Sequence, residues 1–193
     1  ANFASVSGDL RRGGCVLRRA GGDGVTVLSR EHGRNGGRQA GHGGGQTFDE
    51  GTGLPVRDIY ALDGPALDAV VDGCGIDVLA CDLQDVGVRF WTYASTMIDC
   101  LRSASRLGIP FVVLDRPNPL GGLATEGPML ETGFESFVGR LRIPLRHGLT
   151  MGEMARLTAL LDAQAGLATD EPLVVDCPWD RSGFEGEPAL WLA

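Results

Sequence analysis

Polar clusters that follow short apolar runs are the residues of this sequence best placed to do chemistry. They are Glu31-His32-Gly33 after residues 25–28, Asp82-Leu83-Gln84-Asp85 after residues 76–81, and Asp115-Arg116-Pro117-Asn118-Pro119 after residues 111–114. If these runs are strands of one parallel sheet, their carboxyl ends lie along one edge, where open α/β folds bind ligands. Carboxylates far apart in the sequence would then face one crevice, which suits acid–base chemistry on a polar substrate.

Glu31 follows its strand with almost no linker, which favours it as a general acid or base. His32 would then orient Glu31 or the substrate. The alternative interpretation of Glu31-His32-Gly33 is a solvated turn. Between these residues and position 53 the sequence is dense in glycine and predicts a loop, either wrapped around a ligand or mobile.

Asp82 and Asp85 flank the turn after the second run. Both can accept hydrogen bonds from sugar hydroxyls or hold an arginine. Arg89 is close enough in sequence to be that arginine, and the pair would then only stiffen the loop. Both interpretations stay open at this point.

The third cluster is more specific, because each proline fixes its own φ and pushes the preceding residue into an extended conformation. Arg116 and Asn118 therefore sit on a stiff backbone that can hold a binding site at low entropic cost, with Asp115 beside them. A purely structural turn is the alternative. Glu126, in Glu126-Gly127-Pro128, supplies a further carboxylate from a loop.

Two other segments add candidate binding residues. Phe90-Trp91-Thr92-Tyr93 supplies aromatic surface; we expect Phe90 and Trp91 in the core and Tyr93, with its hydroxyl, as the ligand candidate. Arg146-His147-Gly148 precedes a helix whose Thr150-Met151-Gly152-Glu153 reads as a capping box. Arg146 and His147 could meet an anionic group near that helix N-terminus or simply close the loop.

The elements that position these residues predict an α/β fold with a Rossmann-like, mostly parallel sheet flanked by helices. We expect strands at 25–29, 76–82, 111–114 and 172–176, and helices at 64–73, 93–107 and 151–164. Strand, helix and strand in succession form a βαβ unit, whose crossover is right-handed in about 98% of cases. The expected organisation is an irregular segment 1–24, a Rossmann-like domain 25–177, and the start of a truncated C-terminal region at 178–193.

Composition narrows the function classes. The net charge of −8 disfavours nucleic acid as a partner. All 17 basic residues are arginine, which excludes a lysine nucleophile or a P-loop lysine. Five cysteines without CxxC spacing and three scattered histidines indicate neither a disulfide framework nor a metal site, and no cofactor is expected. No run approaches the roughly 20 apolar residues of a membrane span.

The same residues resemble the DUF1343 family, whose characterised members are exo-β-N-acetylmuramidases of the NamZ type. The resemblance spans roughly residues 25–180. It is carried by Glu31-His32-Gly33, Gln39-Ala40-Gly41, Thr52-Gly53-Leu54-Pro55-Val56, the stretch 82–90, Tyr93, Asp115-Arg116-Pro117-Asn118-Pro119-Leu120-Gly121-Gly122, Glu126-Gly127-Pro128 and the stretch 144–153. Arg30 stands where the family typically has proline, and the family's C-terminal domain is largely missing.

The resemblance implies a glycoside hydrolase that releases N-acetylmuramic acid from the non-reducing ends of peptidoglycan fragments. It implies catalytic candidates Glu31 and Glu126, with Asp82 and Asp115, and binding candidates His32, Asp85, Arg89, Tyr93, Arg116, Asn118, Arg146 and His147. Retaining, inverting and substrate-assisted mechanisms all stay open. The lactyl carboxylate of muramic acid calls for a cation, and Arg89, Arg116 and Arg146 are the candidates.

Two other functions compete with this one. The chain could be a non-catalytic carbohydrate-binding or degenerate fragment of such an enzyme, or a nucleotide-binding protein, which the absence of G-x-G-x-x-G after a first strand disfavours. The resemblance implies an extracellular or periplasmic location. The sequence shows no signal peptide, which leaves a cytoplasmic location open.

Overall fold

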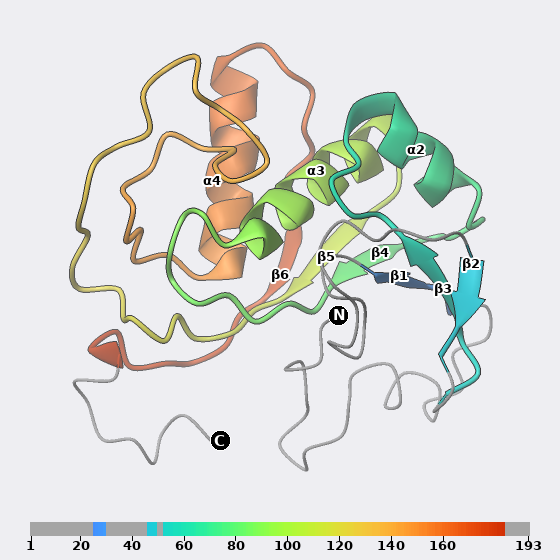
Figure 1. Cartoon of the computed structure of the whole chain (residues 1–193), viewed down its shortest axis with the longest axis horizontal. Helices are drawn as coiled ribbons and strands as arrows, with labels where there is room; N and C mark the ends of the chain where they lie inside the picture. Colours follow the sequence, from blue (N-terminus) through green and yellow to red (C-terminus); the bar gives the residue numbers. More distant parts are fainter. Residues whose placement is uncertain (1–24, 30–45, 50–51, 184–193) are drawn as a thin grey trace.

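The computed structural model describes residues 25–29, 46–49 and 52–183. Strands β1 (Val27–Ser29), β2 (Gln46–Phe48) and β3 (Pro55–Asp58) are followed by helix α2 (Gly64–Asp72) and strand β4 (Leu79–Cys81). Helix α3 (Thr92–Leu107), strand β5 (Phe111–Leu114), helix α4 (Met151–Gln164) and strand β6 (Leu173–Val175) complete the order (Figure 1). This alternation confirms the predicted α/β class.

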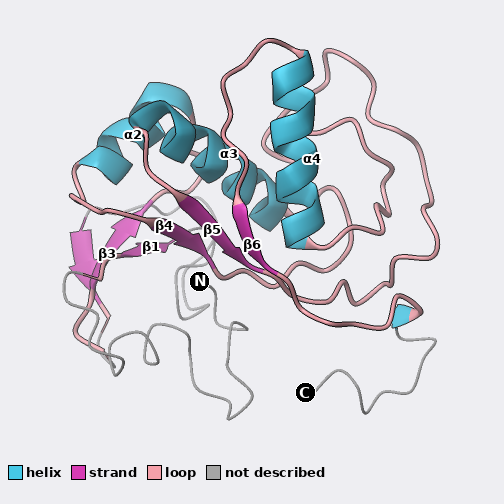
Figure 2. Cartoon of the chain, turned by 180° about the vertical axis from the view of Figure 1, so that it is seen from behind, coloured by secondary structure: helices cyan, strands magenta, loops and turns pink. Residues whose placement is uncertain are grey.

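The strands form two three-stranded sheets that are mostly parallel. In one, β3 pairs in parallel with β1 and antiparallel with β2; in the other, β5 pairs in parallel with β4 and β6 (Figure 2). The expectation that the strand before Glu31 shares one sheet with the two strands before Asp82 and Asp115 is wrong, because β1 pairs with β3 instead. Only the latter two strands end side by side, with Cys81 opposite Val113.

The helices begin and end where their sequences predict. Helix α3 stops at Gly108, whose φ of 67° lies in the left-handed region that glycine tolerates without strain. Helix α4 begins with the predicted capping box, in which the Thr150 hydroxyl accepts from the Glu153 amide and the Glu153 carboxylate accepts from the Thr150 amide. The start of α4 is therefore fixed, and that matters for the site.

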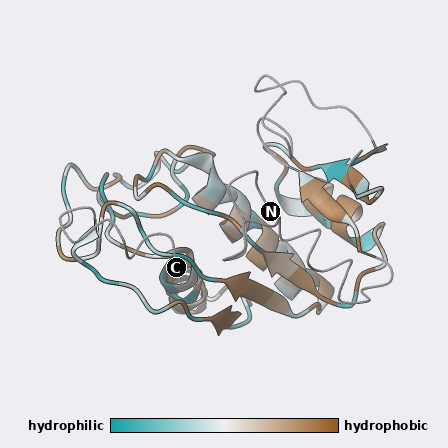
Figure 3. Ribbon diagram, turned by 90° about the horizontal axis from the view of Figure 1, so that it is seen from below, coloured by the Kyte–Doolittle hydropathy of each residue, from teal (hydrophilic) through white to brown (hydrophobic). Residues whose placement is uncertain are grey.

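The core lies between the helices and one face of the β4–β5–β6 sheet. Its fully buried side chains come from every layer: Leu67 and Val71 of α2, Met97, Ile98 and Leu101 of α3, Val113 of β5, and Met151 and Met154 of α4. The strands are correspondingly hydrophobic (brown in Figure 3). Cys81 and Cys100 are buried among these residues, as expected of small apolar side chains. No helix of the described part of the chain is long and apolar enough to cross a bilayer.

Candidate functional site

Asp82 and Arg116 join the ends of β4 and β5. The Arg116 guanidinium donates from Nε and Nη2 to one Asp82 oxygen, at 3.0 and 2.6 Å. Asp82 is 7% exposed, so this charge-assisted pair is held away from bulk water. The predicted pairing of Asp82 with Arg89 is wrong, because Asp82 pairs with Arg116, which lies 34 positions further along the chain. Asp82 and Arg116 meet because β4 and β5 are parallel neighbours, which their spacing in the sequence does not reveal.

Arg89 instead ties two loops together. Its Nη1 donates to the backbone carbonyls of Pro128, at 2.8 Å, and Ile143, at 2.5 Å. The Arg89 guanidinium thus connects two parts of the long loop between β5 and α4. Arg89 is a brace for the loops that present Glu126 and Arg146.

Asp85 and His147 form a second buried contact. His147 Nε2 lies 3.2 Å from Asp85 Oδ2, and both side chains are at most 4% exposed. His147 Nδ1 accepts from the Leu149 amide at 3.1 Å, so the neutral ring carries its proton on Nε2, facing the carboxylate. The contact between His147 Nε2 and Asp85 Oδ2 does not have the geometry of a hydrogen bond. Asp85 Oδ1 has no partner among the described residues. A buried carboxylate oxygen of this kind favours a polar ligand or ordered water.

Asp115 anchors the N-terminus of α4. Its Oδ1 accepts from the amides of Arg116 and Gly152, at 2.9 and 2.8 Å, and its Oδ2 accepts from the Thr150 hydroxyl at 2.6 Å. An acidic side chain at this end of a helix complements both the unpaired amides and the helix dipole. The geometry gives Asp115 a positioning role, and its predicted catalytic role stays a prediction.

Asn118 is equally committed to the backbone. Its amide nitrogen donates to the Leu149 carbonyl and its Oδ1 accepts from the Leu120 amide, both at 2.9 Å, and the residue is 1% exposed. The Gly87 backbone passes so close that a Cβ there would lie 2.3 Å from Asn118 Oδ1, at a φ of 84°. Asn118 therefore locks three loops together; nothing tests its predicted contact with substrate.

Glu126 and Arg146 face each other across a short antiparallel bridge. Each residue's amide donates to the other's carbonyl, at 3.1 and 2.9 Å, and Arg146 Nη1 lies 3.1 Å from Glu126 Oε2. Arg146 Nη2 also donates to the Leu120 carbonyl. The Glu126 side chain is 65% exposed, which makes it the most accessible of the predicted carboxylates that the structure describes.

Of the aromatic residues, Trp91 packs against the core as predicted and Phe90 does not, while the predicted ligand role of Tyr93 stays a prediction. Tyr93 is only 4% exposed, with its ring centroid 5.0 Å from that of Trp91, which packs against the core. Phe90, expected in the core, is 53% exposed. Tyr93 lies on the buried face of α3, so its position in the helix predicts its burial better than the polarity of its hydroxyl does. Glu31 and His32 lie outside the described residues.

Sequence reasoning missed a segment after β6 that reaches this site. Arg181 donates from Nη2 to Glu153 at the start of α4, and its carbonyl accepts from the Gly122 amide at 2.7 Å. A Cβ on Gly122 would lie 3.0 Å from the Trp179 ring and 2.7 Å from Arg181 Nη1. The only sequence signal was a tryptophan and an arginine two positions apart, in a stretch assigned to a separate C-terminal region.

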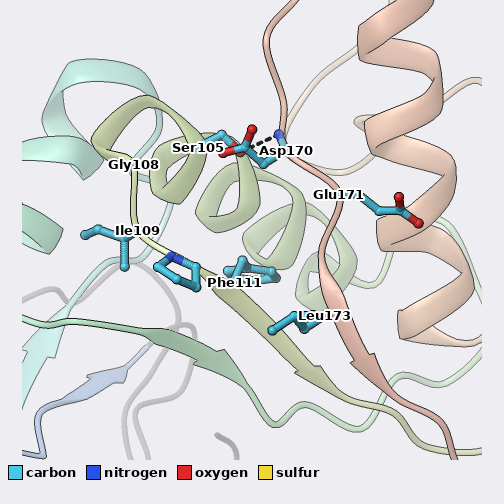
Figure 4. A pocket seen from close by; sticks show the side chains of 8 residues that line it. Ser105, Gly108, Ile109, Phe111, Asp170, Glu171 and Leu173 are labelled. Atoms are coloured by element: carbon cyan, nitrogen blue, oxygen red, sulfur yellow. Dashed lines mark hydrogen bonds between the residues drawn. The ribbon is translucent and has the colours of Figure 1, made fainter.

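A pocket lies at the opposite edge of the sheet. It is lined by Ser105, residues 108–111, Asp170, Glu171 and Leu173, with the Asp170 amide donating to the Ser105 hydroxyl at 2.9 Å (Figure 4). These residues precede β5 and β6, whereas ligands of open α/β sheets bind beyond the carboxyl ends of strands. We therefore place the candidate site at the carboxyl ends. Within the described ranges no group of three acidic, histidine or cysteine side chains is arranged to hold a metal ion.

A mostly parallel α/β sheet with paired aspartate, glutamate and arginine side chains at its carboxyl edge defines the class: an α/β protein with a polar, acid-rich strand-end site. The model of the N-terminal domain of the exo-beta-N-acetylmuramidase NamZ matches residues 1–191. The chain belongs to this family, as its resemblance to DUF1343 proteins predicted.

Relatives support the same assignment. The peptidoglycan beta-N-acetylmuramidase NamZ of Bacillus subtilis (strain 168) is 48% identical over 157 residues, which are 81% of this chain and 37% of the relative. Two crystal structures of DUF1343 family proteins from Bacteroides fragilis NCTC 9343 are similar. One has a TM-score of 0.75 and 34% identity, covering 95% of this chain and 46% of that one; the other has 0.69 and 28%, covering 91% and 45%. The chain spans less than half the length of these relatives.

Proposed function

We propose that this chain supplies the strand-end site of a glycoside hydrolase that releases N-acetylmuramic acid from the non-reducing ends of peptidoglycan fragments. The observation that carries the proposal is the 48% identity to a peptidoglycan beta-N-acetylmuramidase over most of this chain. The acidic residues gathered beyond β4 and β5 support it, because glycoside cleavage ordinarily uses two carboxyl groups, one of which protonates the leaving oxygen.

The contacts divide the predicted carboxylates by role. Asp115 accepts hydrogen bonds from three donors and positions α4. Asp82 is paired with Arg116 and contributes fixed negative charge beside a sugar whose anomeric carbon becomes positive in the transition state. Glu126 is exposed on a loop braced by Arg89 and Arg146 and is our candidate for proton transfer to the glycosidic oxygen or from water. Glu31 is proposed as the second carboxyl group.

Incubation with a chromogenic N-acetyl-β-muramide tests the proposal directly. We expect release of the chromophore by the wild-type chain, and no release from the matching N-acetylglucosaminide. Failure to cleave the muramide under conditions in which the folded chain is intact by circular dichroism would contradict hydrolysis by this chain.

A second function is favoured by one observation. The side chains of Asp82, Asp115 and Asn118 are all engaged in intramolecular contacts, as in a scaffold that binds a saccharide without turning it over. Titration calorimetry with free N-acetylmuramic acid separates the two: binding without cleavage indicates a non-catalytic carbohydrate-binding module, and cleavage indicates the hydrolase.

A further inference from the structure

Muramic acid differs from glucosamine by a lactyl ether whose carboxylate is ionised at neutral pH, so a site that distinguishes the two sugars needs a cation within reach. The arginines predicted for this role are already occupied. Arg89 donates to two carbonyls, Arg116 to Asp82, and Arg146 to Glu126 and the Leu120 carbonyl. The side chains of Arg116 and Arg146 are only 22% and 24% exposed.

Arg181 is more accessible and lies at the same edge of the sheet. Its side chain is 45% exposed, and within the described part of the chain its guanidinium has one hydrogen-bond partner, Glu153. Glu153 is held in turn by the capping box of α4, so Arg181 is tethered at one nitrogen to a fixed helix end. An arginine has five N–H donors, and those not used here remain for a carboxylate.

Trp179 completes the arrangement. The Arg181 guanidinium lies 5.0 Å from the centroid of the Trp179 ring, within the range of a cation–π contact. Such a contact holds the guanidinium beside the ring and uses none of its N–H donors. Both side chains pack on the Gly122 backbone, and no side chain larger than glycine fits there.

Their position links them to the candidate carboxylate. Gly122 lies between Leu120, whose carbonyl accepts from Arg146, and Glu126, which faces Arg146. A Cβ on Gly122 would also lie 2.9 Å from the Gly148 carbonyl, two residues after Arg146. Three segments distant in sequence therefore meet at one glycine: the loop of Glu126, the loop of Arg146 and the stretch 179–183.

We propose that Arg181, held beside Trp179 by a cation–π contact, is the specificity-determining cation that binds the lactyl carboxylate of a muramyl sugar, with Trp179 contributing apolar contact to the same unit. This inference rests on the proposed function and adds to it a carboxylate subsite that lies outside the predicted set of binding residues.

Calorimetric titration with three ligands tests the subsite: N-acetylmuramic acid, its methyl ester and N-acetylglucosamine. For the wild-type chain we expect the free acid to bind about 10-fold more tightly than the ester or the glucosamine, the range for a charge-assisted hydrogen bond. In Arg181→Gln this preference disappears while N-acetylglucosamine binding is retained. In Trp179→Ala all three ligands bind more weakly.

Arg156→Gln is the matched control, because Arg156 is similarly exposed at 43% and also pairs with a carboxylate, that of Asp176. It should bind like the wild type. If the ester binds the wild-type chain as tightly as the acid, the subsite is wrong while muramyl binding stands, whether or not Arg181→Gln folds. An unchanged preference in Arg181→Gln overturns the role of Arg181. Binding of none of the three ligands overturns both this inference and the proposed function.

Discussion

Arginine–carboxylate pairs occur in two regions of the molecule, along α3 and at the carboxyl ends of the strands, and the two sets are built differently. On α3, Arg102 donates from Nε and Nη2 to the two oxygens of Asp162, and Arg106 does the same to Asp68. These two-point contacts fasten α3 to α4 and to α2, respectively. They join rigid helices and use both oxygens of each carboxylate.

At the strand ends Arg116 and Asp82 also meet through their side chains alone, but the other two arginine–carboxylate pairs involve loops and backbone groups. Arg146 divides its guanidinium between Glu126 and a carbonyl, and Arg181 meets Glu153 while its own carbonyl holds Gly122. Here Asp85 keeps a buried oxygen without a partner in the described structure. The comparison teaches that a paired carboxylate does not by itself mark a site, whereas a buried polar atom without a partner calls for a ligand or an ordered water.

The sharpest contrast is expected from Glu126→Gln. This change removes the candidate proton-transfer group, so the rate of muramide cleavage should fall about 1,000-fold, within the range for general acid–base catalysis. The free energy of unfolding should barely change, because the side chain is 65% exposed. Glu131→Gln, a control at an exposed position of the same loop between β5 and α4, should leave the rate unaltered. Comparable rates for both variants would remove Glu126 from the chemistry.

The opposite result is expected from Asp162→Asn. Losing this buried partner of Arg102 should lower the free energy of unfolding by about 3 kcal/mol, measured by urea denaturation, with the strand-end site intact. Asp176→Asn removes an exposed carboxylate, 68% accessible, and should cost less than about 0.5 kcal/mol. Equal losses in the two variants would mean that burial does not distinguish these pairs.

The pH dependence of the same variant follows from the pKa of Asp162. Burial acts to raise that pKa, but hydrogen bonds from Arg102 and Thr169 outweigh it and hold the pKa below its ordinary value. A pKa lowered by folding stabilises the protein fully above the ordinary carboxylate value of about 3.9 and progressively less as the pH falls through the folded-state pKa. The stability gap between wild type and Asp162→Asn should therefore narrow on acidification toward pH 2.

The smallest effect is expected at the junction between the strand ends and α4. In Gly152→Ala the new Cβ would lie 2.5 Å from Val174 Cγ1 and 2.8 Å from Asp115 Oδ2. Overpacking of this kind typically costs 1–3 kcal/mol, and we expect about 2 kcal/mol together with weaker muramyl binding, since Asp115 must shift. Ala155→Gly, inside α4, is the control, expected to cost about 1 kcal/mol without affecting binding. Unchanged binding in Gly152→Ala would separate Asp115 from the site.

Much of the fold was predictable because its signals are local. The apolar spacing of α3, its terminal Gly108 and the Thr150–Glu153 capping box each act within a few residues, and each gave the right element. Strand β2 was missed because Gln46–Phe48 lies in a glycine-rich stretch and forms by pairing with β3. The strand expected at 76–82 is only Leu79–Cys81, the three residues that pair with Phe111–Val113 of β5.

The site was less predictable because its partners are distant in the chain. Sequence patterns selected Asp82, Asp85 and Arg116, but the choice between Arg89 and Arg116 as partner depends on which strands lie side by side. The burial of His147 against Asp85 and the approach of Arg181 to Glu153 likewise arise from tertiary packing. Local sequence patterns therefore identify candidate residues, whereas the order of the strands determines which of them are in contact.

The carboxylate of Asp115 accepts two backbone N–H groups, those of Arg116 after β5 and Gly152 in α4, on a single oxygen. Neither amide proton can be released to solvent while that oxygen stays in place, so their deuterium uptake should be linked. A saccharide that stabilises the strand ends would slow exchange at both amides together, so this pair would report occupancy of the site without any turnover.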